Sequence, residues 1–399
     1  MKSKMHTNIG KIIILVAGLA SSYLHAGTVA YWRFEGDGTN APTAGAQLTG
    51  FAQHTAVQNN GVLAVDSSGN GNTLYSWDSN PAGYNGFWIE YENFVPAPTL
   101  PQTEASNNWS IWTVPYGNNY PAIATWSAIS HPTGTDIETI SPKAWTVEAS
   151  IYCTSFTGQF HTFVGRDGNH VANIDAGQSP LYFSVYNYFP NLTNLVIKFM
   201  DRAGVYYDLH DSVSLALNHW YNVAAVSDGT NLFLYKDSTD GNGYQLVGTM
   251  AETSTNTALA IPTGTYATMS DGSTWAWSVG RGRFGTSANP GDDHVDRFYG
   301  YIDEVRISDT ALQPSQFLFA VPKRPVVTSL TLNGTNAVFA GTNGLNNGTF
   351  YVLTTTNLTL PRSSWTRIAT NVFNGSGNFN FTNPVTASDK QRFYIFQLQ

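Results

Sequence analysis

The chain has 399 residues and a net charge of −8, because 27 acidic residues outnumber 19 basic ones. A chain this acidic lacks the basic surface that nucleic acids and anionic lipids require, so these partners are excluded and cations such as calcium are favoured. Charged residues make up only 12% of the chain and aromatic residues 14%, a composition typical of short strands joined by polar turns.

The N-terminus carries the pattern of a signal peptide. Three lysines precede or flank a short uncharged apolar run over residues 12–20, and small and polar residues follow up to Ala26. The apolar run is too short to span a membrane. We therefore expect residues 1–26 to be removed on export, leaving a secreted, periplasmic or cell-surface protein with no membrane insertion. The alternative is an uncleaved N-terminal anchor.

Downstream, apolar and polar residues alternate in many short runs, which predicts an all-β fold. Asp167-Gly168 and Asp228-Gly229 are hairpin dipeptides in which glycine supplies the positive φ of a tight turn. The single cysteine, Cys153, falls on the apolar face of its run, which predicts a buried, inert thiol and excludes an intramolecular disulfide. The expected strands of the first domain cover residues 28–35, 146–153, 161–166, 181–188, 195–201, 220–227, 232–237, 275–281 and 300–308.

Two stretches interrupt this pattern. Residues 79–141 are rich in Pro, Asn, Gly and Trp, and they are predicted to form an irregular aromatic insertion unless they hold strands that alternation does not reveal. Two prolines around Lys323-Arg324 predict an extended linker. Beyond it, five further strand patterns predict a second, small β-sandwich of immunoglobulin or fibronectin type III style over residues 322–399.

Four motifs of the first domain follow one another in a familiar order. They are Val29–Gly36 with Asp66–Asn72, then Trp145–Ile151, then Trp220–Val226, and finally Tyr299–Ile307. Together they resemble the laminin-G-like, concanavalin A-like jelly-roll domains of bacterial exported proteins. The resemblance implies an antiparallel jelly-roll β-sandwich over residues 27–321. It also implies a structural calcium ion at the edge where the first and last strands meet.

Candidate calcium ligands lie in two places. Asp66, Asn70 and Asn72 share a short loop that is rich in carboxylate and amide oxygens, and hard cations need several such ligands. Asp303 falls on the expected inward face of its strand, where an unpaired charge is costly, and pairing of the first and last strands would bring Glu35 near it. The alternative is that the loop forms Asx turns and Asp303 accepts backbone N–H groups.

Aromatic residues of the 79–141 segment suggest carbohydrate binding. Large amphipathic rings stack on sugar rings, and the same rings serve equally well in a core. The alternative is therefore that they pack the segment onto the sandwich. The residues predicted to bind a ligand are Trp88, Trp109, Trp112, Tyr116 and Trp126.

No catalytic pattern stands out. The Glu-x-Asp-x-x-Glu strand motif, the nucleophile elbow and the phosphate loop are all missing from the sequence. Glu90 and Glu92, and likewise Asp136 and Glu138, have alternate spacing but lie in the segment expected to be irregular. We therefore expect an exported, non-catalytic, lectin-like protein that binds a glycan or a cell-surface or matrix protein. A structural or adhesive role and polysaccharide hydrolysis remain the alternatives.

Overall fold

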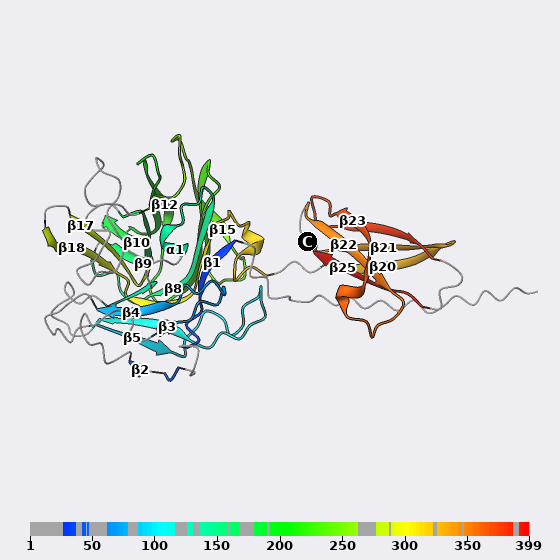
Figure 1. Ribbon diagram of the computed structural model, residues 1–399, viewed down its shortest axis with the longest axis horizontal. Helices are drawn as coiled ribbons and strands as arrows, with labels where there is room; N and C mark the ends of the chain where they lie inside the picture. The colour runs from blue at the N-terminus through cyan, green and yellow to red at the C-terminus, as the bar shows by residue number, and fades with distance from the viewer. Residues whose placement is uncertain are drawn as a thin grey trace, which may run out of the picture. The chain divides into compact units, whose positions relative to one another are not determined.

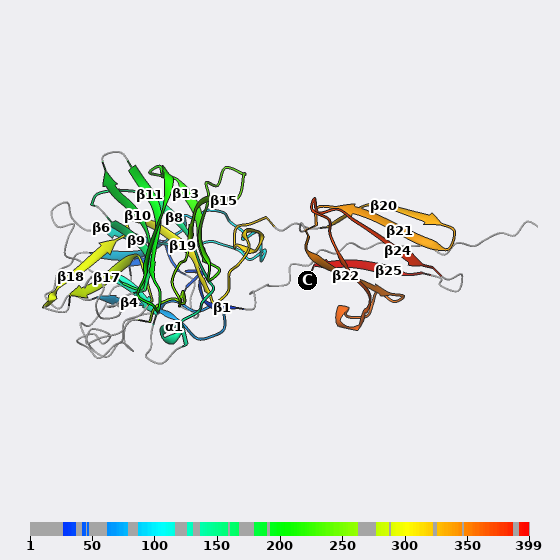
Figure 2. The same cartoon turned by 90° about the horizontal axis from the view of Figure 1, so that it is seen from above.

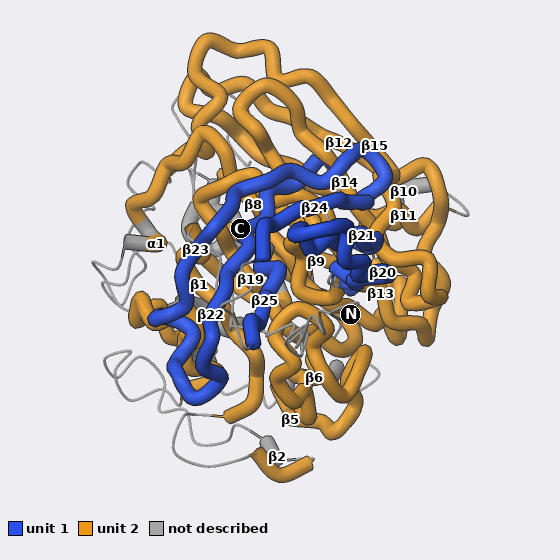
Figure 3. The backbone as a smooth tube through the Cα atoms, turned by 90° about the vertical axis from the view of Figure 1, so that its right-hand side faces the viewer, with its two compact units in different colours: residues 1–21, 321–399 blue, residues 22–320 orange. Residues whose placement is uncertain are grey.

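The computed structural model divides into two compact units, one over Ser22–Ala320 and one containing Val321–Gln399, coloured separately in Figure 3. The predicted signal peptide lies outside the described residues. Within those residues, no helix is long and apolar enough to cross a membrane. The structure describes residues 27–36, 42–44, 46–47, 62–78, 87–115, 126–130, 136–158, 160–166, 179–189, 192–261, 277–286, 289–321, 325–344, 347–385 and 391–398.

The first unit is a sandwich of two antiparallel sheets (Figures 1 and 2), so the predicted all-β sandwich is confirmed. One sheet has the order β15-β14-β13-β8-β19-β6-β5-β2, with β1 also paired to β19; the other has the order β12-β11-β10-β9-β16-β7-β4-β3. The nine-stranded sheet comprises β1 (Thr28–Trp32), β2 (Ala46–Gln47), β5 (Phe87–Glu92), β6 (Ser110–Pro115), β8 (Trp145–Cys153), β13 (Trp220–Ser227), β14 (Asn231–Asp237), β15 (Gln245–Ala251) and β19 (Gly300–Ser308).

The eight-stranded sheet comprises β3 (Val62–Ala64), β4 (Leu74–Asp78), β7 (Trp126–Ser130), β9 (Phe160–Arg166), β10 (Leu181–Phe189), β11 (Leu192–Met200), β12 (Tyr206–Ser214) and β16 (Trp277–Val279). A separate hairpin, β17 (Arg281–Thr286) with β18 (Asn289–Arg297), follows β16. The short helix α1 (Asp136–Thr139) precedes β8, and a 3-10 turn, η2 (Pro314–Gln316), follows β19.

Alternation along the strands builds the core between the sheets. On β8, Val147, Ala149 and Ile151 are buried in the main apolar cluster together with Phe183 of the facing sheet. Cys153 belongs to the same cluster, and burial raises the pKa of its thiol. The expected burial of the cysteine is confirmed.

Three strands occupy much of the segment that was expected to be irregular. β5 and β6 extend one sheet, and β7 lies between β4 and β16 in the other. On β5, Ile89 and Tyr91 enter the core while Glu90 and Glu92 have the opposite parity. The described part of the segment therefore corrects the expectation of an irregular insertion.

The second unit is a smaller sandwich of two three-stranded antiparallel sheets, with the orders β20-β21-β24 and β23-β22-β25. Its core is rich in phenylalanine, including Phe339, Phe350 and Phe379. The predicted second sandwich is thus confirmed. It has one strand more than predicted, β21, which was missed because Ala and Gly are uncommon in strands. The elements are β20 (Val326–Asn333), β21 (Asn336–Thr342), β22 (Thr349–Thr355), η3 (Arg362–Ser364), β23 (Thr366–Val372), β24 (Phe379–Pro384) and β25 (Phe393–Leu398).

Candidate functional site

The first and last strands of the first unit lie side by side, as expected. β1 pairs with β19 in antiparallel register, with Trp32 opposite Val305. β19 also pairs with β8, but this register shifts between Asp303 and Arg306, and Glu304 has a φ of 50°. The β-bulge leaves two successive carboxylates, Asp303 and Glu304, fully buried.

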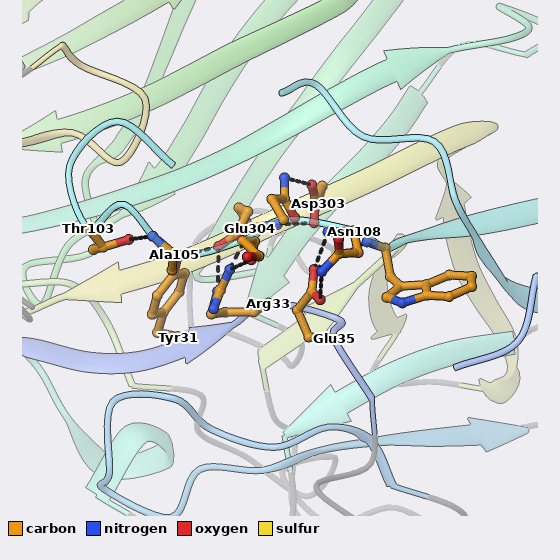
Figure 4. Close-up of polar contacts among 11 residues, drawn as sticks. Tyr31, Arg33, Glu35, Thr103, Ala105, Asn108, Asp303 and Glu304 are labelled. Atoms are coloured by element: carbon orange, nitrogen blue, oxygen red, sulfur yellow. Dashed lines mark hydrogen bonds and ion pairs between the residues drawn. The ribbon is translucent and has the colours of Figure 1, made fainter. Parts of the chain in front are cut away.

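An acidic cluster surrounds this bulge (Figure 4). Glu304 accepts a hydrogen bond from the Tyr31 hydroxyl, and its Oε1 lies 3.1 Å from Arg33 Nε. The Oδ2 atom of Asp303 accepts a hydrogen bond of 2.8 Å from Asn107 Nδ2, and its Oδ1 accepts the Glu304 main-chain N–H at 2.9 Å. We define the acidic cluster as Tyr31, Arg33, Glu35, Asn107, Asp303 and Glu304.

Glu35 follows β1 and enters the same cluster. Its Oε1 accepts the main-chain N–H groups of Asn108 at 2.6 Å and Trp109 at 3.2 Å, and its Oε2 accepts the Asn108 side-chain amide at 3.1 Å. Burial raises the pKa of both Asp303 and Glu304, and the Glu35 charge adds to both shifts. Glu35 and Asp303 thus accept hydrogen bonds from two successive residues of one loop, Asn108 and Asn107.

The electrostatics of the cluster favour an added positive charge. Burial, and then the Glu304 charge, raise the pKa of Asp303 well above its usual range. Burial raises the pKa of Glu304 to about 7, although Arg33 and the Tyr31 hydroxyl oppose the shift. A carboxyl whose pKa is raised by folding stabilises the fold fully at a pH below its unfolded pKa. That contribution is lost as the pH rises through its pKa in the folded state. When both groups are ionised, the two buried carboxylates repel each other, and a cation beside them would offset this repulsion.

Asn107 supplies an oxygen that the described residues leave without a partner. The side chain is 1% exposed, its nitrogen is used by Asp303, and nothing donates to its Oδ1. An unpaired buried amide oxygen costs about 1–3 kcal/mol, and amide oxygens are common calcium ligands. Among the described residues, no three His, Cys, Asp or Glu side chains are placed to hold a metal ion. The oxygen atoms gathered around the bulge are those of the Asp303 and Glu35 carboxylates, which accept hydrogen bonds, and that of the Asn107 amide, which does not.

The other three predicted metal ligands form a loop bound to β1. Asp66 Oδ1 accepts the main-chain N–H groups of Tyr31 and Ser68, both at 2.9 Å, and its Oδ2 accepts Ser68 Oγ and the Asn72 N–H. Asn70 and Asn72 direct their amide nitrogens to main-chain carbonyls of β1. These contacts are those of an Asx-type turn, the alternative considered for this loop. The five predicted ligands thus belong to two sets of contacts rather than to one.

Two of the five aromatic residues predicted to bind a ligand are described in full. Trp109 is half-buried and packs against the main core, as the packing alternative expects. Trp112, on β6, is also half-buried, and its ring stacks on that of Tyr301 with centroids 5.5 Å apart and an interplanar angle of 11°. The other three lie wholly or partly outside the described residues: the side chains of Trp88 on β5 and Trp126 on β7 are not described, and neither is any part of Tyr116.

A row of rings crosses four neighbouring strands of the nine-stranded sheet. The strand registers place each ring opposite the next. Flanking residues such as Ile151 and Ile302 are fully buried in the core, so the row lies on the outer face of the sheet. We call this row the aromatic ladder; its members are Trp220 on β13, Tyr152 on β8, Tyr301 on β19 and Trp112 on β6.

Phe94, in the loop after β5, lies against the ladder. Its ring centroid is 4.9 Å from those of Tyr152 and Tyr301 and 5.5 Å from that of Trp220. Phe94 is 39% exposed, and three ladder rings are half-buried. Trp220 is 8% exposed, and its indole N–H is a buried donor without a hydrogen-bond partner. The exposed parts of such rings can contact the apolar face of a sugar.

Two carboxylates continue the row on β5. Glu90 lies opposite Trp112, and Glu92, two residues along, has the same parity. Burial and the Glu90 charge raise the pKa of Glu92, and burial followed by the Glu92 charge raises the pKa of Tyr301. The spacing noted in the sequence therefore falls on a regular strand beside the ladder. The second pair, Asp136 and Glu138, lies in α1, where its side chains are outside the described ones.

Sequence reasoning missed most of both sites. The ladder residues Tyr152, Trp220 and Tyr301 alternate with core residues, so their parity could have marked them as outward-facing. The sequence does not reveal the strand registers that align these residues. Glu304 was missed because a β-bulge reverses parity locally, which a strict alternation cannot anticipate. Asn107 was missed because it lies in the β5–β6 connection, where no strand pattern indicates which side chains are buried.

Comparison with known proteins gave matches among solved structures only. No family model and no curated protein sequence matches this chain. Domain 4 of AbnA, an extracellular arabinanase from Geobacillus stearothermophilus solved with arabinotriose, aligns at 17% identity over 73% of this chain and 96% of its own, with a TM-score of 0.39.

Two further structures align at lower scores. A heptameric SAP-like pentraxin from Limulus polyphemus has 17% identity over 44% of this chain and 68% of its own, with a TM-score of 0.29. The binding domain of botulinum neurotoxin serotype D/C has 10% identity over 82% of this chain and 57% of its own, with a TM-score of 0.34. At TM-scores this low the fold assignment depends on the chain's own strands and registers.

Proposed function

We propose that the protein is an exported, non-catalytic glycan-binding protein whose ligand lies along the aromatic ladder. The observation that supports this most directly is the alignment of one large aromatic ring per strand across four strands. Neighbouring strands are about 4.8 Å apart, so the row extends about 14 Å. Because Phe94 packs against three of the four rings and Trp220 is 8% exposed, a ligand would contact Phe94 together with the half-buried Trp112 and Tyr301.

The proposal includes a structural calcium ion in the acidic cluster. The unpaired Asn107 oxygen and the repulsion between buried carboxylates support it. The cluster and the ladder are joined through the β5–β6 connection, which carries both Asn107 and Phe94. Within it, Asn93 donates to the Asn108 carbonyl and Ser110 to the Phe94 carbonyl. A cation bound by Asn107 would therefore hold the loop that places Phe94 on the ladder.

Binding can be tested by titrating the protein with a panel of soluble polysaccharides in a calorimeter. Trp112→Ala and Tyr301→Ala should each weaken the affinity about tenfold or more, since each removes a stacking surface worth about 1–3 kcal/mol. Tyr186→Ala is the matched control, because this half-buried tyrosine lies on β10 of the other sheet.

Three outcomes would contradict the proposal. Loss of affinity in Tyr186→Ala alone would move the site to the other sheet. Saturable binding to no member of the panel would favour the structural or adhesive role. Release of new reducing ends from a bound polysaccharide would contradict the non-catalytic part and would direct attention to Glu90 and Glu92.

A further inference from the structure

A pocket opens in the loop between β14 and β15, beyond the Trp220 end of the ladder. Its volume is about 350 Å³, which lies within the range of small-molecule pockets, about 300–1,000 Å³. The pocket is therefore large enough for one sugar unit. It is lined by Ser238, Asp240, Asn242, Gly243 and Gln245.

The loop lies on the outer face of the nine-stranded sheet, as the ladder does. The register of β13 with β14, continued past its last pair, places Thr239 opposite Trp220, so the loop begins about one strand spacing, 4.8 Å, from the end of the row. At the other end of the loop, Tyr244 packs in one cluster with Ala224 of β13. Ala224 has the same parity as Trp220 and therefore shares its face. A glycan chain that passes Phe94 toward Trp220 would thus reach the pocket.

Hydrogen bonds hold the start of this loop against the ladder. The buried Asn222 accepts Ser150 Oγ at 2.6 Å and donates to Asp237 Oδ2 at 3.0 Å. Asp237 Oδ1 accepts the Thr239 N–H at 2.9 Å, and Thr239 Oγ1 donates to the Trp220 carbonyl at 3.2 Å. Thr239 has a φ of 51°, which is unfavourable for a β-branched residue and persists only where the surrounding contacts enforce it. The position of the pocket is therefore fixed relative to the ladder.

The lining of the pocket consists of hydrogen-bonding groups without a positive charge. Asp240 Oδ1 accepts the Asn242 main-chain N–H at 3.0 Å, and Gln245 Nε2 donates to the carbonyls of Asn242 and Gly243 at 3.0 and 3.3 Å. Among the described residues, none donates to Gln245 Oε1 and none is hydrogen-bonded to the Ser238 hydroxyl. Carboxylate and amide oxygens accept from sugar hydroxyls, and a serine hydroxyl both donates and accepts.

We infer that this pocket is a subsite for one unit of a neutral glycan, whose hydroxyl groups bind Asp240, Gln245 and Ser238 while the chain continues over the ladder. The Asp240 carboxylate is the one charge among the five lining residues, and it would repel the carboxylate of a uronic acid. The net charge of −8 acts in the same direction. This inference rests on the proposed glycan-binding function and adds to it a ligand class and a second contact site.

The test is a calorimetric titration with neutral polysaccharides, namely glucan, mannan, galactan, xylan and arabinan, and with the tetramer of galacturonic acid. A neutral polysaccharide should bind, and Asp240→Asn and Gln245→Ala should each weaken its affinity about fivefold, as the loss of one or two hydrogen bonds would give. Asp240→Asn keeps an oxygen that can accept the Asn242 N–H, so the loop should retain its conformation. The matched control is Asp228→Asn, an exposed aspartate in the turn at the opposite end of β14, which should leave the affinity unchanged.

The outcomes separate this inference from the function on which it rests. A neutral glycan that binds equally well to both pocket variants, but less well to Trp112→Ala, would overturn the subsite and leave the ladder intact. Binding confined to the galacturonic acid tetramer would overturn the neutral ligand class. An equal loss in Asp228→Asn would overturn the subsite as well, because the effect would then come from the overall charge. If no probe binds saturably, the proposed function fails and this inference fails with it.

Discussion

Asp66 and Asp303 are both buried aspartates near β1, yet their oxygens face different partners. Both oxygens of Asp66 are filled by four N–H and O–H donors from the neighbouring loop and strand. Asp303 accepts one hydrogen bond from the Asn107 side-chain amide and one from the Glu304 main-chain N–H, and the charge of Glu304 raises its pKa. A carboxylate that is saturated with donors stabilises a turn, whereas one that lies beside another buried acid is better suited to a cation.

Calcium should therefore raise the melting temperature of the protein through Asp303 and not through Asp66. In Asp303→Asn the difference between melts in EDTA and in calcium should disappear, because the ion loses a charged ligand. In Asp66→Asn the protein should lose about 1–3 kcal/mol, since an amide nitrogen would face N–H donors, but the calcium shift should persist. Differential scanning fluorimetry in both media measures this. A calcium shift that vanishes only in Asp66→Asn would return the site to the loop.

Glycine at the start of β19 determines how closely that strand approaches β8. Gly300 has a φ of 149°, and a Cβ atom there would lie 1.9 Å from the Tyr152 carbonyl oxygen. Gly300→Ala should therefore displace Tyr301 from the ladder. It should lower the free energy of unfolding, measured by urea denaturation, by about 3 kcal/mol or more. Gly158→Ala is the control, because its φ of 102° is also unfavourable but nothing lies within 4 Å of the added atom; it should cost about 1–2 kcal/mol. Equal costs would show that β19 shifts freely.

Strand positions were predictable where aliphatic residues alternate, as in β8, β13 and β19. They were missed in β5 and β6, which are short and lie in a segment rich in Pro, Asn and Gly. The pairing of β1 with β19 followed from the expected order of the fold, which is why Glu35 and Asp303 were placed together. The ladder could not be anticipated, because its four rings come from positions 112, 152, 220 and 301, and only strand register brings them into line.

At the scale of the whole molecule, each unit has its own apolar core. The main cluster is formed by residues of the first unit, and a phenylalanine-rich cluster by residues of the second. The basic, proline-flanked stretch at 322–325 was predicted to be a linker, and residues 322–324 lie outside the described residues. Cores that share no residues can unfold independently.

Scanning calorimetry of the protein should accordingly show two transitions. Calcium should raise the midpoint of the one with the larger enthalpy, because the acidic cluster belongs to the larger unit and enthalpy of unfolding scales with the number of residues. The other transition should keep its midpoint, since no residue of the cluster lies beyond Ala320. Asp303→Asn should remove the shift and leave the smaller transition where it was. A single transition whose calorimetric and van't Hoff enthalpies agree would mean that the two cores unfold as one cooperative unit, and calcium bound in the first would then stabilise both.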